Sequence, residues 1–245
     1  MSRWFIIISG RIKESTLEIK QVRPLFNFLS KLYNIYIAVL VGAVLVGIYE
    51  YYSYTHLPVD YDPTRDVIAS DFFTMIIGLL QFIFIILLFI NFLRFIHRTA
   101  KNLQQKYNQH MRFTPGWSIG YFFIPILNLF RPYQAVKDIW DTSGRKAHSD
   151  DSLVGIWWAL WILSNVLGRA AMKYTMKNLD AGADTTSTIL YLISDSLDIV
   201  LYVIEFKMVK TIATSFFRNF EENPEIINES RVTYPENQTT GEKSL

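Results

Sequence analysis

The sequence predicts an all-α membrane protein, a four-span helical bundle with an additional segment that proline breaks. Hydrophobic residues make up 51% of its 245 residues, charged residues make up 19%, and the mean hydropathy is +0.18. A soluble domain of ordinary composition carries about 25% charged residues. The charges also fall between long apolar runs, which is the pattern of a polytopic membrane protein.

Four apolar segments are long enough to cross a bilayer, whose hydrocarbon core of about 30 Å takes about 20 helical residues. The spans are expected at about residues 35–49, 72–93, 153–171 and 188–206. Tyrosines lie at both ends of the first, as in an aromatic belt. The second is the most apolar, and only Gln81 and Asn91 interrupt it strongly.

The sequence divides into three parts. Residues 1–33 are expected to form a cytoplasmic or interfacial segment, residues 34–220 the membrane domain, and residues 221–245 a disordered polar tail. Ser15 and Glu18 have the spacing of a capping box. A short amphipathic helix is therefore expected near the membrane surface, before Pro24.

The apolar stretch at about 113–133 does not fit a straight span. It contains Pro125, which removes a helical hydrogen bond in mid-segment. Backbone groups freed in this way cannot face lipid. The stretch is therefore expected to form a helix–break–helix that either dips into the membrane or lies along its surface.

The distribution of basic residues predicts the topology. If residues 113–133 do not cross, then 1–34, 94–152 and the tail from 207 share one side and hold 20 of the 24 Lys and Arg. If they do cross, the division is 14 against 10. The positive-inside rule favours the first arrangement, with four spans and both termini in the cytoplasm.

The stretch from Arg112 to Gln134 resembles the hallmark of a bacterial family of membrane proteins known as domain of unknown function 4328. Runs at 94–98 and 157–169 are similar to the same family, and the resemblance covers roughly residues 75 to 212. Tyr121 and Phe130 depart from it, since tryptophan is expected at both. The resemblance implies a multi-pass protein of the bacterial cytoplasmic membrane and implies no activity. The hallmark residues are Arg112, Pro115, Gly116, Trp117, Pro125, Asn128, Arg131, Pro132, Tyr133 and Gln134.

No catalytic constellation is present in the sequence. It has no His-Glu-x-x-His zinc motif, no Gly-x-Ser-x-Gly elbow and no phosphate-binding glycine loop. The chain lacks cysteine, and its four histidines are scattered. We therefore predict no catalytic residue, cofactor or metal. The net charge of +2 gives no field that attracts nucleic acid.

The last predicted span carries a stripe of polar residues. Asp195, Asp198 and Glu205 fall within about 100° of one helix face. A lipid-facing carboxylate costs about 2.5–3.5 kcal/mol near the bilayer centre, so the stripe must face protein or water. A structural ion-pair network and a functional site both fit this pattern. The candidate buried polar site comprises Asp195, Asp198, Arg169, Asn165, Tyr202, Glu205, Arg131, Asn128 and Asn91.

Arg169 is the predicted partner of Asp195, with Asp198 sharing the pair. In the four-span arrangement the two lie about 10 Å apart along the membrane normal. Their side chains lean toward each other, because each tilts toward the N-terminus of its own helix.

Three functions remain open. The leading hypothesis is a non-enzymatic protein whose buried polar site binds a ligand, a lipid or a partner. The alternative is a proton- or ion-coupled transporter or channel that uses Asp195 and Asp198, and a membrane enzyme is third. The expected partners are the lipid bilayer and either a second copy of the chain or another membrane protein.

Overall fold

The computed structural model describes residues 2–57, 69–107, 111–144, 152–178 and 185–222, with side chains described outside 2–21, 105–107 and 219–222. These residues are almost entirely helical and include no strand. In order, the elements are α1 (Ser2–Thr55), α2 (Ala69–Tyr107), α3 (Pro115–Gly120), the 3₁₀ turns η1 (Tyr121–Phe123) and η2 (Leu127–Leu129), α4 (Arg131–Ser143), α5 (Leu153–Lys177) and α6 (Thr185–Glu222).

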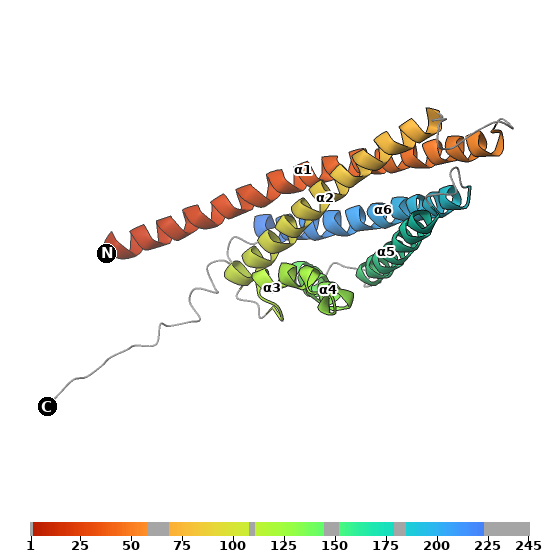
Figure 1. Ribbon diagram of the computed structural model, residues 1–245. Helices are drawn as coiled ribbons and strands as arrows, with labels where there is room; N and C mark the ends of the chain where they lie inside the picture. Colours follow the sequence, from red (N-terminus) through yellow and green to blue (C-terminus); the bar gives the residue numbers. More distant parts are fainter. Residues whose placement is uncertain (1, 58–68, 108–110, 145–151, 179–184, 223–245) are drawn as a thin grey trace.

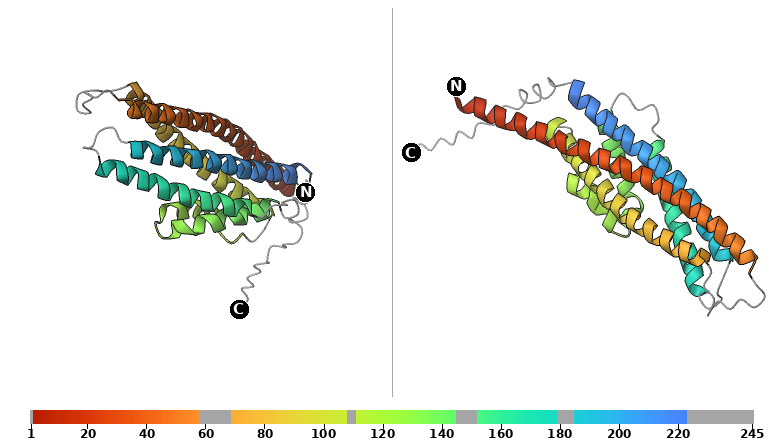
Figure 2. Two further views of the ribbon diagram at one scale, coloured as in Figure 1. Left: turned by 90° about the vertical axis from the view of Figure 1, so that its right-hand side faces the viewer. Right: turned by 90° about the horizontal axis from the view of Figure 1, so that it is seen from above.

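The four long helices form an elongated bundle in which successive helices run in opposite directions (Figure 1). Helix α1 packs against both α2 and α6, and α5 packs against α6. The short elements α3 and α4 lie together at the end of the bundle where α2 ends (Figures 1 and 2). The polar stripe of α6 therefore lies inside the bundle, between α1 and α5.

Among the described residues, three helical segments are long and apolar enough to cross a membrane: Val22–Thr55, Ala69–Gln104 and Leu153–Lys177. Only 6% of the most apolar part of α2 is buried. Side chains such as Phe82 and Leu79 face outward there, at 63% and 60% exposed. An apolar surface of this size needs lipid around it, and the chain is an integral membrane protein. The fourth predicted span lies in α6, which is not one of the three.

Helix α1 differs from the expected N-terminal segment, because it continues through Pro24 without a break from Ser2 to Thr55. The predicted helix before Pro24 is thus the beginning of α1. A proline in a helix removes one hydrogen bond and crowds one turn. Here Val22, Leu25 and Leu29 are buried on both sides of Pro24, so packing against the bundle holds the helix together.

The stretch 113–133 is broken at Pro125. Pro115 begins α3, where Thr114 caps the helix by accepting a hydrogen bond from the Trp117 amide at 3.4 Å. Ile124 is extended, with φ −99° and ψ 111°. The residue before a proline is driven out of the helical region by its ring, and the helix therefore stops there.

Side chains from the long helices satisfy part of this irregular backbone. His97 Nδ1 lies 3.1 Å from the Pro115 carbonyl oxygen, and Trp158 Nε1 donates to the Leu129 carbonyl at 3.1 Å. Gln104 Nε2 donates to the Phe113 carbonyl at 3.3 Å. Helices α2 and α5 thus supply hydrogen bonds that a regular helix would make internally.

The polar tail predicted from 221 lies, from residue 223 onward, outside the described residues. Glu221 and Glu222 themselves end α6.

Candidate functional site

Two cavities flank α6 along its polar stripe. The first, here named the α5–α6 cavity, has a volume of about 390 Å³ and lies between α2, α5 and α6. The second, the α1–α6 cavity, has a volume of about 320 Å³ and lies between α1, α2 and α6. One helix therefore presents acids to two separate spaces.

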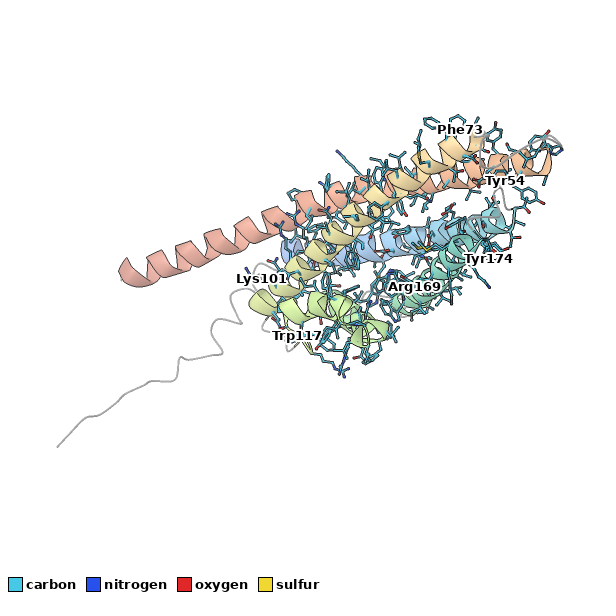
Figure 3. The ribbon with its side chains drawn as sticks, in the orientation of Figure 1. Tyr54, Phe73, Lys101, Trp117, Arg169 and Tyr174 are labelled. Atoms are coloured by element: carbon cyan, nitrogen blue, oxygen red, sulfur yellow. The ribbon has the colours of Figure 1, made fainter. Side chains whose placement is uncertain are left out.

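The polar wall of the α5–α6 cavity comes from two facing helices. Helix α6 contributes Asp198 and Glu205, and α5 contributes Ser164 and Arg169. The Ser164 hydroxyl donates a hydrogen bond to Asp198 Oδ1. Arg169 is exposed, in the C-terminal half of α5 (Figure 3). It is the basic residue among those that line this cavity.

Glu205 lies at the buried end of the α5–α6 cavity and is only 7% exposed. Tyr33 of α1, which is fully buried, donates a hydrogen bond to Glu205 Oε1 at 2.9 Å. This bond fixes the carboxylate between α1 and the cavity. Burying a polar group without such a partner is costly.

Aromatic rings cover the same end of the cavity. The Phe92 ring centroid lies 5.8 Å from that of Trp157 and 6.2 Å from that of Phe122. Trp157 is 1% exposed and lies against Glu205, yet its Nε1 makes no hydrogen bond of regular geometry with the described residues. An apolar wall with few polar groups is typical of small-molecule sites.

Carboxylates and hydroxyls dominate the polar lining of the α1–α6 cavity. Glu50 accepts hydrogen bonds from Thr74 Oγ1 at 2.9 Å and from Thr188 Oγ1 at 3.1 Å. Asp195 Oδ1 accepts one from Gln81 Nε2 at 2.9 Å. The described residues that line this cavity include no Lys, Arg or His.

The predicted pair of Arg169 and Asp195 is not formed. Asp195 lines the α1–α6 cavity and bonds to Gln81, whereas Arg169 lines the α5–α6 cavity. The prediction placed both on one interface because it treated α6 as having one buried face. In the bundle α6 is covered from two sides, and Asp195 faces α2.

Three other candidate residues lie away from the acids. Asn91 donates to the Leu87 carbonyl of its own helix at 2.8 Å. Arg131 lies over the rings of the broken segment, and neither it nor Asn128 lines either cavity. Asn165 and Tyr202 do line the α5–α6 cavity, together with Asp198, Glu205 and Arg169.

Sequence reasoning missed the contribution of α1. Glu50 lies just beyond the predicted first span of about 35–49, but it is 8% exposed inside α1. The signal was available in the spacing of Tyr33, Tyr36, Leu40, Ala43, Gly47 and Glu50, which alternate by three and four residues. That spacing puts them on one face of a helix.

No group of three or more His, Cys, Asp or Glu side chains in the described part of the chain could hold a metal ion. The polar groups of both cavities are acids, amides, hydroxyls, indole N–H groups and one guanidinium. Such groups can bind and orient a molecule through hydrogen bonds and charge.

The match to a known family covers most of the chain. The family model described as "Domain of unknown function (DUF4328)" matches residues 62–214. The chain belongs to this family. The matched range confirms the resemblance seen in the sequence and contains α2 to α5 and most of α6. No curated protein and no solved structure is significantly similar to this DUF4328 protein.

In the hallmark stretch of this DUF4328 protein, Arg131 lies against aromatic rings. The Arg131 guanidinium carbon lies 5.8 Å from the Tyr121 ring centroid and 5.9 Å from that of Phe113. Its Nη1 donates to Gln134 Oε1 at 3.0 Å. A cation over aromatic faces is favourable, so Arg131 holds the broken segment against the start of α4.

Asp138 of α4 binds the beginning of this stretch, at Arg112. Its Oδ2 accepts a hydrogen bond from the Arg112 amide at 2.8 Å. Burial raises the pKa of the Asp138 carboxyl, although hydrogen bonds from the Arg112 and Phe113 amides act in the opposite direction.

Proposed function

We propose that α1, α2, α5 and α6 all span the bacterial cytoplasmic membrane, with both termini in the cytoplasm. Packing supports a transmembrane α6, because α1 and α5 cover its acids and spare them contact with lipid. Lys101 and Trp117 lie at the end of the bundle opposite Tyr54, Phe73 and Tyr174 (Figure 3). The first end is the cytoplasmic one on the basic-residue count.

We propose further that the broken segment enters the membrane without crossing it. Ile126, Phe123 and Leu129 are 75%, 65% and 59% exposed on this segment. Large apolar side chains that are exposed near basic residues, here Arg112 and Arg131, favour insertion at the bilayer surface.

The activity that we propose is non-enzymatic: binding of a small amphiphilic molecule in the α5–α6 cavity. The observation that carries this proposal is the combination of an open volume of about 390 Å³ with a buried carboxylate and an aromatic wall. Ligand sites typically measure about 300–1,000 Å³ and place a few polar groups in an apolar lining.

A pair of glycine variants tests this proposal. Gly168 lines the cavity, and a Cβ there would meet only Ser194 Oγ, at 3.8 Å. In Gly168→Leu the larger side chain therefore enters the cavity. Gly155 is on the same helix, outside the cavity lining, where a Cβ would meet nothing within 4 Å. Gly155→Leu is thus the matched control.

Native mass spectrometry of the full chain in nanodiscs, with a thermal-shift screen of amphiphiles, provides the measurement. We expect a co-purified or screened ligand to be lost in Gly168→Leu and kept in Gly155→Leu. Equal ligand content in the wild type and both variants would refute binding in this cavity.

A second candidate function is proton- or ion-coupled transport. It is favoured by one observation: Asp195 and Asp198, three residues apart on α6, face opposite cavities. Ionisable groups within membrane-spanning helices commonly mark ion pathways and proton relays. Uptake into proteoliposomes, with the double variant Asp195→Asn and Asp198→Asn as the inactive form, separates transport from binding.

A further inference from the structure

We propose that the α5–α6 cavity binds a monovalent organic cation, with its ammonium group at Glu205 and its apolar part against the aromatic wall. This inference rests on the proposed function, because it names the chemical class of the ligand bound in the same cavity.

The first support is the placement of charge along the cavity. Asp198 and Glu205 are seven residues apart on α6, about 10 Å along the helix axis. Arg169 is twelve residues from Trp157 on α5, about 18 Å along that axis.

Two contacts show which residues of α5 lie beside which residues of α6. The Ser164–Asp198 hydrogen bond and the contact between Trp157 and Glu205 show that α5 and α6 run side by side in opposite directions. Arg169 therefore lies at the Asp198 end of the cavity, where its charge offsets that of Asp198. Glu205 faces the other end, where no basic side chain lines the cavity.

The second support is the unused hydrogen-bonding capacity at that end. Tyr33 donates to Oε1 of Glu205, and a carboxylate has room for further donors on Oε2. Buried polar groups are normally paired, so Oε2 of Glu205 is suited to a group that brings its own hydrogen-bond donors, as an ammonium does.

The third support is the aromatic surface beside the carboxylate. Phe92, Trp157 and Phe122 lie edge to face or tilted around the same space. Aromatic faces attract cations, and the attraction increases when the cation is removed from water. A carboxylate among aromatic rings therefore selects an ammonium group over a neutral or anionic group of the same size.

The experiment compares three probes of similar size, each with one phenyl ring: benzylammonium, benzyl alcohol and benzoate. Each is titrated by isothermal calorimetry into the full chain in nanodiscs, with protein-free nanodiscs subtracted. We expect saturable binding of benzylammonium alone. We expect the affinity to fall about tenfold or more in Glu205→Gln, because the charge that selects the cation is removed.

Glu50→Gln is the matched control. Glu50 is also a buried glutamate that accepts hydrogen bonds from hydroxyls, but it lines the other cavity. We expect it to leave benzylammonium binding unchanged. If Glu205→Gln does not fold, as judged by size-exclusion chromatography, Gly168→Leu replaces it and should abolish binding, with Gly155→Leu as its control.

Three outcomes would overturn the inference. The first is equal binding of all three probes, and the second is benzylammonium binding that is insensitive to both Glu205→Gln and Gly168→Leu. The third is no saturable binding of benzylammonium. In each case the ligand content of Gly168→Leu and Gly155→Leu still decides separately whether the cavity binds any molecule.

Discussion

Tyr33 donates a hydrogen bond of 2.9 Å to Glu205, across α1 and α6 and 172 residues apart in the sequence. A second polar contact, from Thr188 to Glu50, lies seventeen residues farther along both helices. Equal intervals on two antiparallel helices mean one constant register. An apolar seam can slip by a turn without leaving a polar group unpaired, but this seam cannot.

Replacing Tyr33 with Phe removes the donor and leaves the aromatic packing in place. We expect a loss of about 1–3 kcal/mol in the free energy of unfolding, because Glu205 stays buried without this partner. Equilibrium unfolding in detergent with added denaturant measures this loss.

The matched control for this change is Tyr51→Phe, also on α1, where the side chain is 40% exposed. It should change the stability by less than about 0.5 kcal/mol. Equal losses in the two variants would mean that the Tyr33 hydroxyl contributes nothing specific.

Gly47 of α1 packs closely against α6. A Cβ at this position would lie 2.8 Å from Leu192 Cδ2 and 3.1 Å from its Cγ. We expect Gly47→Ala to destabilise the protein by about 1–3 kcal/mol through overpacking. The double variant with Leu192→Ala should lose less stability than the two single variants added together, since the clash disappears.

Gly78 of α2 supplies the control for Gly47. A Cβ there would meet nothing within 4 Å. Gly78→Ala should therefore be neutral or stabilise by up to about 1 kcal/mol, because alanine favours the helix. Melting temperatures in one detergent compare the two, and a larger loss from Gly78→Ala would contradict the packing shown at Gly47.

The partner of Asp195 can be identified by a double-mutant cycle. Gln81 donates to Asp195, and Arg169 lines the other cavity. We expect an interaction energy of about 0.5–3 kcal/mol between Gln81→Ala and Asp195→Ala. Arg169→Ala and Asp195→Ala should be additive within about 0.5 kcal/mol. A non-additive Arg169 pair would restore the ion pair that the sequence suggested.

The sequence was sufficient to predict the helical class, the break at Pro125 and the family. Each of these depends on local chemistry: apolar runs as long as a bilayer is thick, a proline that forces Ile124 out of the helix, and a run of about twenty characteristic residues. The length of α1 could not be predicted in the same way. Pro24 reads locally as an end, and only burial of Val22 and Leu29 against other helices keeps the helix continuous.

The candidate site was only half predicted, for a related reason. Helical periodicity identified the acidic stripe of α6, because the period is a property of one helix. Which neighbour each acid meets depends on how α6 is rotated between α1, α2 and α5. No periodicity within α6 distinguishes Gln81 from Arg169 as the partner of Asp195. The α1 face that carries Tyr33 and Glu50 was readable, but only once α1 was known to continue beyond Tyr49.

The topology can be tested by cysteine labelling, because the chain has no cysteine of its own. Asp141 of α4, whose side chain is 53% exposed, and Met176 of α5, 59% exposed, lie at opposite ends of the proposed bundle. We expect an impermeant maleimide to label Met176→Cys in intact cells and Asp141→Cys only after permeabilisation. The reverse pattern would mean that the chain has the opposite orientation in the membrane. Labelling of both positions from outside would mean that α5 does not cross it.

Asp138 should make the stability of the protein depend on pH in a defined direction. Burial raises the pKa of its carboxyl above the value of about 3.9 expected in the unfolded chain. The folded state therefore holds the proton more firmly. The resulting stabilisation is fully present below the unfolded pKa and is lost as the pH rises through the folded pKa.

In Asp138→Asn this group does not titrate, and the amide oxygen can still accept the hydrogen bond from the Arg112 amide. We therefore expect the stability of the variant minus that of the wild type to increase from about pH 3.5 upward and to level off above the folded pKa of Asp138. The starting point of about pH 3.5 is roughly half a unit below the pKa of this group in the unfolded chain. Melting curves of both proteins across this range measure the difference, in which the titration of groups remote from Asp138 cancels. A difference that is constant with pH, or that falls as the pH rises, would show that burial does not control this carboxyl.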